Sequence, residues 1–257
     1  MERILRFPAL GWIMENNEDT REFAEFAADQ LRRLAISISH QNTDHGRKCF
    51  LFTSIKPGGG TTQLCLDLAR ELAHIGTRTV AVEANAFRPD SRYESGQPGG
   101  LVDLIEGGVL LEDIVAPAEG NLPDRIAVGD TKNLRHLDFN SRLIESLREC
   151  PFDICLIDSP PILLSADTEF LSRDCDATIL VIEGSALLEG ELRRANSILE
   201  KIRPPLVGFI ANRIHVKKGS GYFSLLLKEY DSGRKVSSKG WFWNQFSRAK
   251  EYKTKET

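Results

Sequence analysis

The feature that most constrains this chain is a glycine-rich turn between an apolar segment and an amphipathic one. The apolar run CFLFTS, residues 49–54, is typical of a buried strand, and the turn IKPGGGTT follows it directly. Regularly spaced leucines predict a helix over residues 63–75, and Gly76 suits the left-handed position just past its end. Between a strand and a helix N-terminus, the backbone N–H groups of such a turn cradle phosphate. The sequence therefore predicts a phosphate loop built by Pro57, Gly58, Gly59, Gly60, Thr61 and Thr62.

The phosphate loop lacks the residue that makes such loops good catalysts. A standard loop ends in Gly-Lys-Ser/Thr, where the lysine contacts the terminal phosphates and the hydroxyl binds magnesium. Thr61 stands at the lysine position, whereas Thr62 keeps the magnesium hydroxyl. Loss of one charge-stabilising donor typically lowers the rate by about two to three orders of magnitude. The expected ligands are ATP or ADP with Mg²⁺, and the missing charge leaves their binding open.

Another lysine lies at the entrance of the phosphate loop. Lys56 is either a replacement cation, which reaches the phosphates in cis or across a dimer, or a solvent-exposed loop lysine. The sequence leaves both interpretations open.

Two acidic residues follow apolar runs, where a parallel strand presents its carboxyl end. Asp158 ends the run DICLID, and in a phosphate-loop protein an aspartate there holds the metal together with Thr62. The alternative is an N-cap or turn aspartate. Glu83 and Asn85 follow another run, either as a second acidic site that has lost one carboxylate or as plain strand-end polar residues. The candidate catalytic residues are therefore Asp158, Glu83 and Lys56.

Apolar runs alternate with amphipathic segments along the chain. Strands are expected over residues 77–84, 125–128, 153–158, 176–183 and 205–212, and helices over 22–38, 100–107, 110–115, 142–148 and 189–201, with a polar loop over 41–48. The strand runs are nearly continuous in apolar residues, as in parallel strands covered on both faces. This order predicts an α/β fold with a doubly wound, mostly parallel sheet and helices on both faces. We expect a helical docking or oligomerisation segment over residues 1–40, a nucleotide-binding domain over 41–214 and a tail over 215–257.

Five segments share the order and spacing of a known family's motifs. They are TSIKPGGGTTQ, VAVEANAFRPD, GLVDLIEGGVLLEDIV, FDICLIDSPPILLSAD and VGFIANRI, within residues 23–213. The chain at these motifs resembles the cytoplasmic domain of bacterial tyrosine autokinases that control capsule and exopolysaccharide chain length. The resemblance implies a P-loop NTPase fold like that of partition ATPases and an ATP-dependent tyrosine kinase activity. It also implies a membrane polysaccharide co-polymerase or adaptor as partner, and an adenine contact at Asn212.

The chain departs from this family at the positions that carry chemistry. The loop lysine is Thr61, and the family's paired aspartates are Glu83 and Asn85. The tyrosines of the tail do not cluster, and the family's Glu-x-x-Arg-x-x-Arg association motif is blurred around residues 25–33. Together these departures predict a degenerate member, a pseudokinase. Lys56 also resembles a lysine of partition and division-site ATPases, although those proteins keep the second lysine.

Charge is distributed unevenly along the chain. The net charge is −4, but residues 215–257 hold ten Lys/Arg against four Asp/Glu, which gives +6 there and −10 elsewhere. In this tail the segment GWFWNQFSRAK sets aromatic residues beside cations. Such a segment suits an anionic membrane surface, or it folds back onto the domain. Nucleic acid is not an expected partner, because the main body is acidic.

The sequence carries no pattern that predicts export. No run approaches the roughly 20 apolar residues that span a bilayer. The N-terminus is broken by charges and a proline and is a poor signal peptide. The five cysteines are scattered, which favours a reducing compartment without a zinc site. We therefore expect a cytoplasmic protein, peripheral at the inner face of the plasma membrane.

Three functions are open at this point. The first is a weakly catalytic or non-catalytic regulator of polysaccharide synthesis or export. The second is a working tyrosine kinase in which Lys56 replaces the missing lysine. The third is a partition-type ATPase that switches by nucleotide-dependent self-association.

Overall fold

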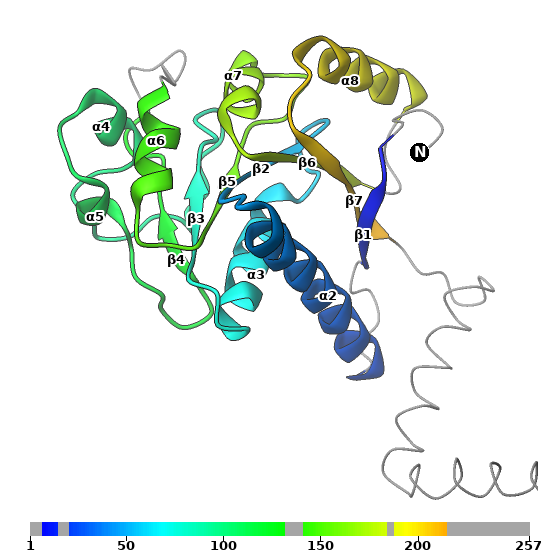
Figure 1. Ribbon diagram of the computed structural model, residues 1–257, viewed down its shortest axis with the longest axis horizontal. Helices are drawn as coiled ribbons and strands as arrows, with labels where there is room; N and C mark the ends of the chain where they lie inside the picture. The colour runs from blue at the N-terminus through cyan, green and yellow to red at the C-terminus, as the bar shows by residue number, and fades with distance from the viewer. Residues whose placement is uncertain (1–6, 15–20, 132–140, 184–187, 215–257) are drawn as a thin grey trace, which may run out of the picture. The chain divides into compact units, whose positions relative to one another are not determined.

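The computed structural model describes residues 7–14, 21–131, 141–183 and 188–214 (Figure 1). Its strands are β1 (Ala9–Met14), β2 (Cys49–Ser54), β3 (Thr79–Glu83), β4 (Asp124–Ile126), β5 (Ile154–Asp158), β6 (Ala177–Glu183) and β7 (Leu206–Ile214). Its helices are α2 (Arg21–His45), α3 (Thr61–His74), α4 (Leu101–Glu106), α5 (Leu111–Ile114), α6 (Ser141–Glu149), α7 (Ala166–Asp174) and α8 (Glu189–Ile202). In the described part of the chain, no helix has both the length and the hydropathy that a bilayer-spanning helix needs. The chain divides into two compact units: the first holds the sheet, and the described part of the second is the start of α2, up to Ala28.

The seven strands are parallel and form one sheet in the order β1-β7-β6-β2-β5-β3-β4. After β2 the chain builds β3, β4 and β5 on one side of that strand, and it then crosses to β6 and β7 on the other side (Figure 1). The direction of winding therefore reverses at β2. In doubly wound sheets, ligands bind at this switch point, outside the carboxyl ends of the strands. The structure confirms the predicted doubly wound parallel sheet.

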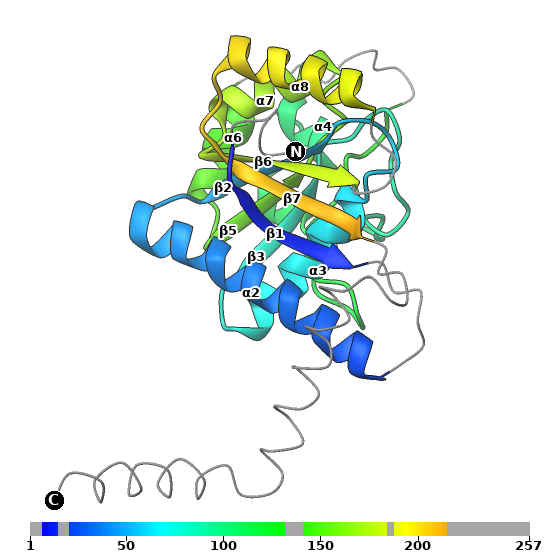
Figure 2. The same cartoon turned by 90° about the vertical axis from the view of Figure 1, so that its right-hand side faces the viewer.

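Side chains of β2 alternate between two cores, one on each face of the sheet. Phe50 and Phe52 pack with leucines of α3 and with residues of α2 from Leu34 onward. Cys49 and Leu51 pack on the opposite face with residues of α6. Figures 1 and 2 show α3 on one face of the sheet and α6, α7 and α8 on the other. The continuous apolar runs are thus explained by burial on both faces.

α2 is longer than expected from the sequence, and it includes residues expected in a polar loop. The helix ends just before Gly46, which has a positive φ of 66°. Asn42 stabilises this end, because its Nδ2 donates to the carbonyl oxygens of Arg47 at 2.8 Å and Asp153 at 3.0 Å. The expectation of a loop from residue 41 is therefore wrong up to residue 45. The polar side chain finds its partner on a distant segment.

The sequence analysis does not predict β1 or α7. β1 pairs in parallel with β7 at the edge of the sheet, and the Phe209 N–H donates to the Pro8 carbonyl at 3.0 Å. The expected helical segment over residues 1–40 thus contains a strand of the sheet. α7 begins after Ser165, whose Oγ accepts the N–H of Asp167 at 3.1 Å and so caps the helix.

Gly208→Ala is expected to weaken the attachment of β1 to β7. A Cβ at position 208 would lie 2.4 Å from the Pro8 carbonyl oxygen and 2.8 Å from Leu10 Cγ, so the strands must move apart. We expect the free energy of unfolding in urea to fall by about 1–3 kcal/mol. The matched control is Gly11→Ala, whose added Cβ meets Leu34 Cδ1 at an ordinary 3.8 Å. Equal stability of the two variants would contradict this packing of β1.

Candidate functional site

The strand ends bring the predicted acidic residues and the phosphate loop to one edge of the sheet. β5 lies between β2 and β3, and Asp158 is the Cα partner of both Phe52 and Glu83. The phosphate loop leaves the same edge after Ser54, whose carbonyl accepts the N–H of Ile162 at 2.9 Å. Asp158, Glu83 and the loop therefore lie together at the carboxyl ends of the central strands.

The backbone of the phosphate loop requires its glycines. Gly58 and Gly60 have positive φ angles of 90° and 79°, which favour glycine. A Cβ on Gly59 would lie 2.6 Å from Ser54 Cβ, so the strand end leaves no room for a side chain. α3 begins at Thr61, and its first N–H groups add the positive end of the helix dipole. The loop therefore has the shape and the polarity of a phosphate cradle.

The end of β7 holds the phosphate loop through two carbonyl oxygens. Asn212 Nδ2 donates to the Gly59 carbonyl at 2.8 Å, and Arg213 Nη1 donates to the Gly58 carbonyl at 2.7 Å. Arg213 has a φ of 52°, an uncommon value for a residue with a side chain. Asn212 is buried and braces the loop. Its contact with adenine stays a prediction.

Thr61 brings no charge to the loop, and its side chain is withdrawn from solvent. The residue is 7% exposed, and its Oγ1 has no hydrogen-bond partner among the described residues. A neutral hydroxyl does not neutralise the charge that develops on transferring phosphate. Thr62 follows on the first turn of α3 and is half-buried. The pair therefore offers one hydroxyl for a metal and no cation.

Lys56 is directed toward α8. Its Nζ forms an ion pair with Glu191 Oε2 at 3.2 Å. The two side chains are 31% and 29% exposed, and ion pairs this open to solvent contribute about 0–1 kcal/mol. Pro57, the next residue, is exposed. The ion pair thus contributes little to stability.

Asp158 has the surroundings of a metal ligand. It is 1% exposed, and neither carboxylate oxygen has a hydrogen-bond partner among the described residues. Burial above all raises its pKa to about 7. The nearby Thr62 hydroxyl opposes this rise without reaching good hydrogen-bond geometry, and the charge of Glu83 adds to it. A buried carboxylate without a partner, beside a hydroxyl, is a suitable place for a cation.

The residues present fit a magnesium ion that shares its ligands with a nucleotide. Magnesium usually keeps several waters and takes one or two protein ligands plus phosphate oxygens. Asp158 and Thr62 would supply those protein ligands. In the ranges that the structure describes, no three His, Cys, Asp or Glu side chains gather as a complete metal site.

The Glu83 carboxylate is engaged by the backbone. Its Oε1 accepts the N–H of Asp90 at 2.6 Å, and its Oε2 accepts the N–H of Val128 at 3.1 Å. The residue is 2% exposed, and burial raises the pKa of its carboxyl to about 7. Asn85 Oδ1 is buried without a hydrogen-bond partner in the described structure. This geometry supports the structural interpretation of Glu83 over that of a catalytic acid.

Arg92 is a cation of the site that the sequence analysis does not identify. Its Nε and Nη2 donate to the two carboxylate oxygens of Asp90, each at 2.8 Å. Its Nη1 donates to Oε1 of Gln63 on the first turn of α3. The spacing of Asp90 and Arg92 is a local signal for their ion pair. No sequence pattern links Arg92 to Gln63.

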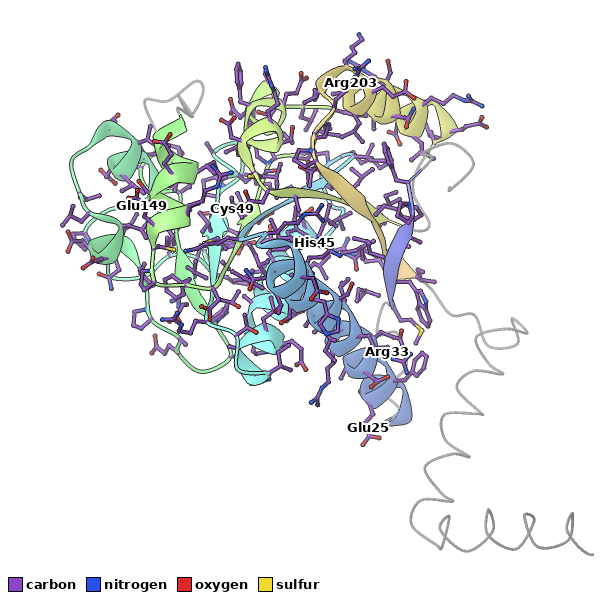
Figure 3. The ribbon with its side chains drawn as sticks, viewed as in Figure 1. Glu25, Arg33, His45, Cys49, Glu149 and Arg203 are labelled. Atoms are coloured by element: carbon purple, nitrogen blue, oxygen red, sulfur yellow. The ribbon has the colours of Figure 1, made fainter. Side chains whose placement is uncertain are left out.

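The cysteines belong to the cores and not to the site. All five are free and buried, and Cys49 lies on β2 (Figure 3). Cys150 Sγ lies 3.7 Å from Cys155 Sγ in the core that faces α6. They pack there as small apolar side chains.

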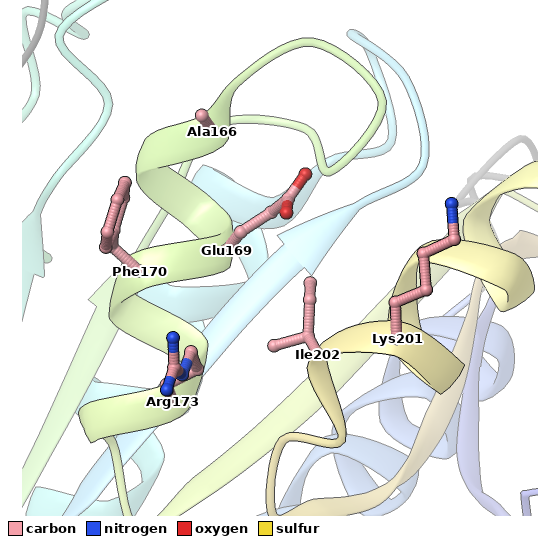
Figure 4. Close-up of a pocket in the computed structure, with 6 residues that line it drawn as sticks. All are labelled: Ala166, Glu169, Phe170, Arg173, Lys201 and Ile202. Atoms are coloured by element: carbon pink, nitrogen blue, oxygen red, sulfur yellow. The ribbon is translucent and has the colours of Figure 1, made fainter.

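A separate cavity lies between α7 and α8 (Figure 4). It measures about 410 Å³ and is lined by Ala166, Glu169, Phe170, Arg173, Lys201 and Ile202. This lining comes from the body of α7 and the end of α8. The phosphate cradle instead lies between the end of β2 and the start of α3.

Comparison with known proteins finds similarity to bacterial tyrosine kinases, although no family model matches the chain. The tyrosine-protein kinase CpsD of Streptococcus agalactiae serotype III (strain NEM316) is 27% identical over 191 residues, which cover 70% of this chain and 81% of that protein. The BceF tyrosine kinase domain superposes with a TM-score of 0.68 and 25% identity, over 83% of this chain and 96% of that domain. The septum site-determining protein MinD from Pyrococcus horikoshii OT3, solved with Mg-ADP, superposes with a TM-score of 0.54 and 21% identity, over 66% of this chain and 72% of MinD. The MinD likeness shows the shared fold.

Asp158→Asn is expected to stabilise the protein at high pH in the absence of metal and nucleotide. The pKa of Asp158 is near 4 in the unfolded chain and about 7 in the folded protein. Between these pH values the folded protein holds a proton that the unfolded chain has released, so the stability of the wild type falls as pH rises. At pH 8 the variant should gain on the order of 2–4 kcal/mol in free energy of unfolding, and much less at pH 5. Urea denaturation in chelator at both pH values measures this gain. Asp44→Asn, on the exposed side of α2, is the control and should show no such pH-dependent gain.

Proposed function

This chain belongs to the family of bacterial tyrosine autokinases, and on that premise we propose that it is a degenerate member. In this proposal it regulates capsule or exopolysaccharide synthesis or export by docking to a membrane co-polymerase or its adaptor. The observation that carries the proposal is Thr61, a neutral and buried residue at the position of the phosphate-binding lysine. Nucleotide acts as a structural ligand and turns over slowly.

Binding and turnover depend on different parts of the site. The glycines of the loop and the first N–H groups of α3 bind phosphate through the backbone, which does not need the lysine. Phosphoryl transfer depends on cations that stabilise the charge of the transition state. Asp158 and Thr62 supply ligands for Mg²⁺, while residue 61 supplies no charge. We therefore expect MgATP to bind and the chemical step to be slow.

The docking surfaces are proposed from the resemblance and from charge. Residues 1–40 serve docking or self-association, and the basic tail contacts anionic lipid at the inner face of the plasma membrane. The tail lies outside the described residues. Figure 3 labels Glu25 and Arg33 on α2 at the blurred association motif. Arg33 Nε donates to Asp29 Oδ2 at 2.9 Å within that helix.

Thr61→Lys is expected to restore catalysis. The added charge should raise MgATP affinity roughly tenfold, because hydrogen bonds to charged groups contribute about 1.5–3 kcal/mol. Turnover and tyrosine phosphate should rise by about two to three orders of magnitude. Calorimetry with MgATP and MgADP, together with phosphate release, measures both effects. Thr61→Gln, with a long neutral side chain, is the control for size. Wild-type turnover within about threefold of the Thr61→Lys variant would overturn the degenerate assignment.

A second candidate function is a working kinase that uses Lys56. It is favoured by the position of Lys56 at the entrance of the loop, where its ion pair with Glu191 is partly exposed and contributes little stability. Under our proposal, Lys56→Ala changes phosphate release by less than about twofold, since the residue stabilises no transition state. A loss of roughly 100-fold in Lys56→Ala would support the working kinase instead. Glu191→Gln is the matched control, because it breaks the same ion pair and keeps the lysine.

A further inference from the structure

We propose that Arg92 binds the terminal phosphate of a nucleoside triphosphate and so supplies, for binding rather than for phosphoryl transfer, a positive charge that Thr61 does not. This inference rests on the proposed function, because it takes a bound nucleotide as its premise. It starts from the position of the Arg92 guanidinium at the first turn of α3.

Arg92 reaches α3 from the segment that follows β3. Its Nη1 donates to Oε1 of Gln63, the residue directly after Thr62. α3 is 14 residues long, and its N-terminus carries positive partial charge. A cation beside this end of a helix is unfavourable unless an anion compensates it. Asp90 provides part of this compensation, and a phosphate group in the cradle provides the rest.

A chain of hydrogen bonds ties Arg92 to the ends of the central strands. The guanidinium of Arg92 donates hydrogen bonds to both carboxylate oxygens of Asp90. The N–H of Asp90 donates to Glu83 at the end of β3, and Glu83 is the Cα partner of Asp158 on β5. The guanidinium is therefore positioned relative to the candidate metal ligand by three successive contacts. A positioned cation needs little rearrangement when a ligand arrives.

The guanidinium keeps donors for a phosphate. An arginine has five N–H donors in a fixed fork. The bonds to Asp90 and Gln63 use three of them, one each from Nε, Nη1 and Nη2. One N–H of each terminal nitrogen remains for a phosphate oxygen. The side chain is 38% exposed, so an incoming nucleotide can reach it.

Arg92 lies on the same side of the phosphate loop as the candidate metal ligand. Arg92 is linked through Asp90 to Glu83 of β3, and β3 lies on the same side of β2 as β5, which carries Asp158. Two other cations of the described residues, Lys56 and Arg213, are engaged on the opposite side of β2. Lys56 pairs with Glu191 of α8, and Arg213 lies 3.9 Å from Glu183 at the end of β6. Arg92 is therefore the cation best placed to share a terminal phosphate with a metal on Asp158.

Calorimetry with MgATP and MgADP on the full chain tests this role through the preference for triphosphate. Diphosphate lacks the terminal group, so only MgATP should depend on Arg92. We expect Arg92→Gln to bind MgATP on the order of tenfold more weakly than wild type and MgADP within about twofold. Arg92→Lys, which keeps the charge and loses the fork, should recover part of the MgATP affinity. Urea denaturation of each variant establishes that it is folded.

Asp90→Asn separates phosphate binding from support of the loop. This variant weakens the hydrogen bonds from Arg92 to residue 90 and leaves the guanidinium charged, so the affinity for MgATP should be unchanged or higher. If Arg92 only supported the loop, Asp90→Asn and Arg92→Gln would weaken MgATP and MgADP alike, and the proposal would be overturned. If the wild type binds MgATP no more tightly than MgADP, the role of Arg92 is also overturned, but the nucleotide binding in the proposed function is not. If the wild type binds neither MgATP nor MgADP, nucleotide is not part of the proposed function, and the role of Arg92 is overturned as well.

Discussion

The structure depends on the fixed position of β2 at the centre of the sheet. β2 pairs with β5 on one edge and β6 on the other, and all six of its residues are buried. Its carbonyls also accept the N–H groups of Ser159 at 3.0 Å and Ile162 at 2.9 Å, which follow β5. The phosphate loop therefore starts from a point that sheet pairing determines, whatever residue stands at position 61. This explains how the chain can keep the shape of a phosphate cradle without the lysine.

The electrostatics of the site favour joint binding of metal and nucleotide. Burial raises the pKa of both Asp158 and Glu83 to about 7, so the carboxyls are costly to ionise together. A divalent cation at Asp158 would remove this cost, and it would bring positive charge to a loop that has threonine at the position of the lysine. The phosphate in turn supplies the oxygen ligands that two protein residues cannot. Under the proposed function, each ligand would therefore increase the affinity for the other, by reciprocal linkage.

Local patterns predicted the central strands, the phosphate loop and its following helix, because apolar runs and glycines act over a few residues. Features that depend on distant contacts were missed. β1 becomes a strand by pairing with β7, and α2 extends because Asn42 reaches the Asp153 carbonyl, 111 residues away. At the site, Asp158 was identified from its strand end. That its carboxylate finds no hydrogen-bond partner among the described residues depends on how the surrounding elements pack. Arg92 was missed because its contact with Gln63 joins two different segments.

The structural role of Glu83 and the proposed role of Arg92 are connected through Asp90. The family resemblance implies a pair of aspartates at positions 83 and 85, where this chain has Glu83 and Asn85. The glutamate is one methylene longer than an aspartate, and in the structure it reaches the backbone N–H groups of both Asp90 and Val128. The contact with Asp90 positions the carboxylate that in turn holds Arg92. An acidic group that the family resemblance assigns to catalysis thus supports a cation in this chain.

On this view, the loss of the loop lysine and the change of the acidic pair are related changes. Together they leave threonine where the resemblance implies a lysine on the loop, and they place an arginine, held by Asp90, beside the first turn of α3.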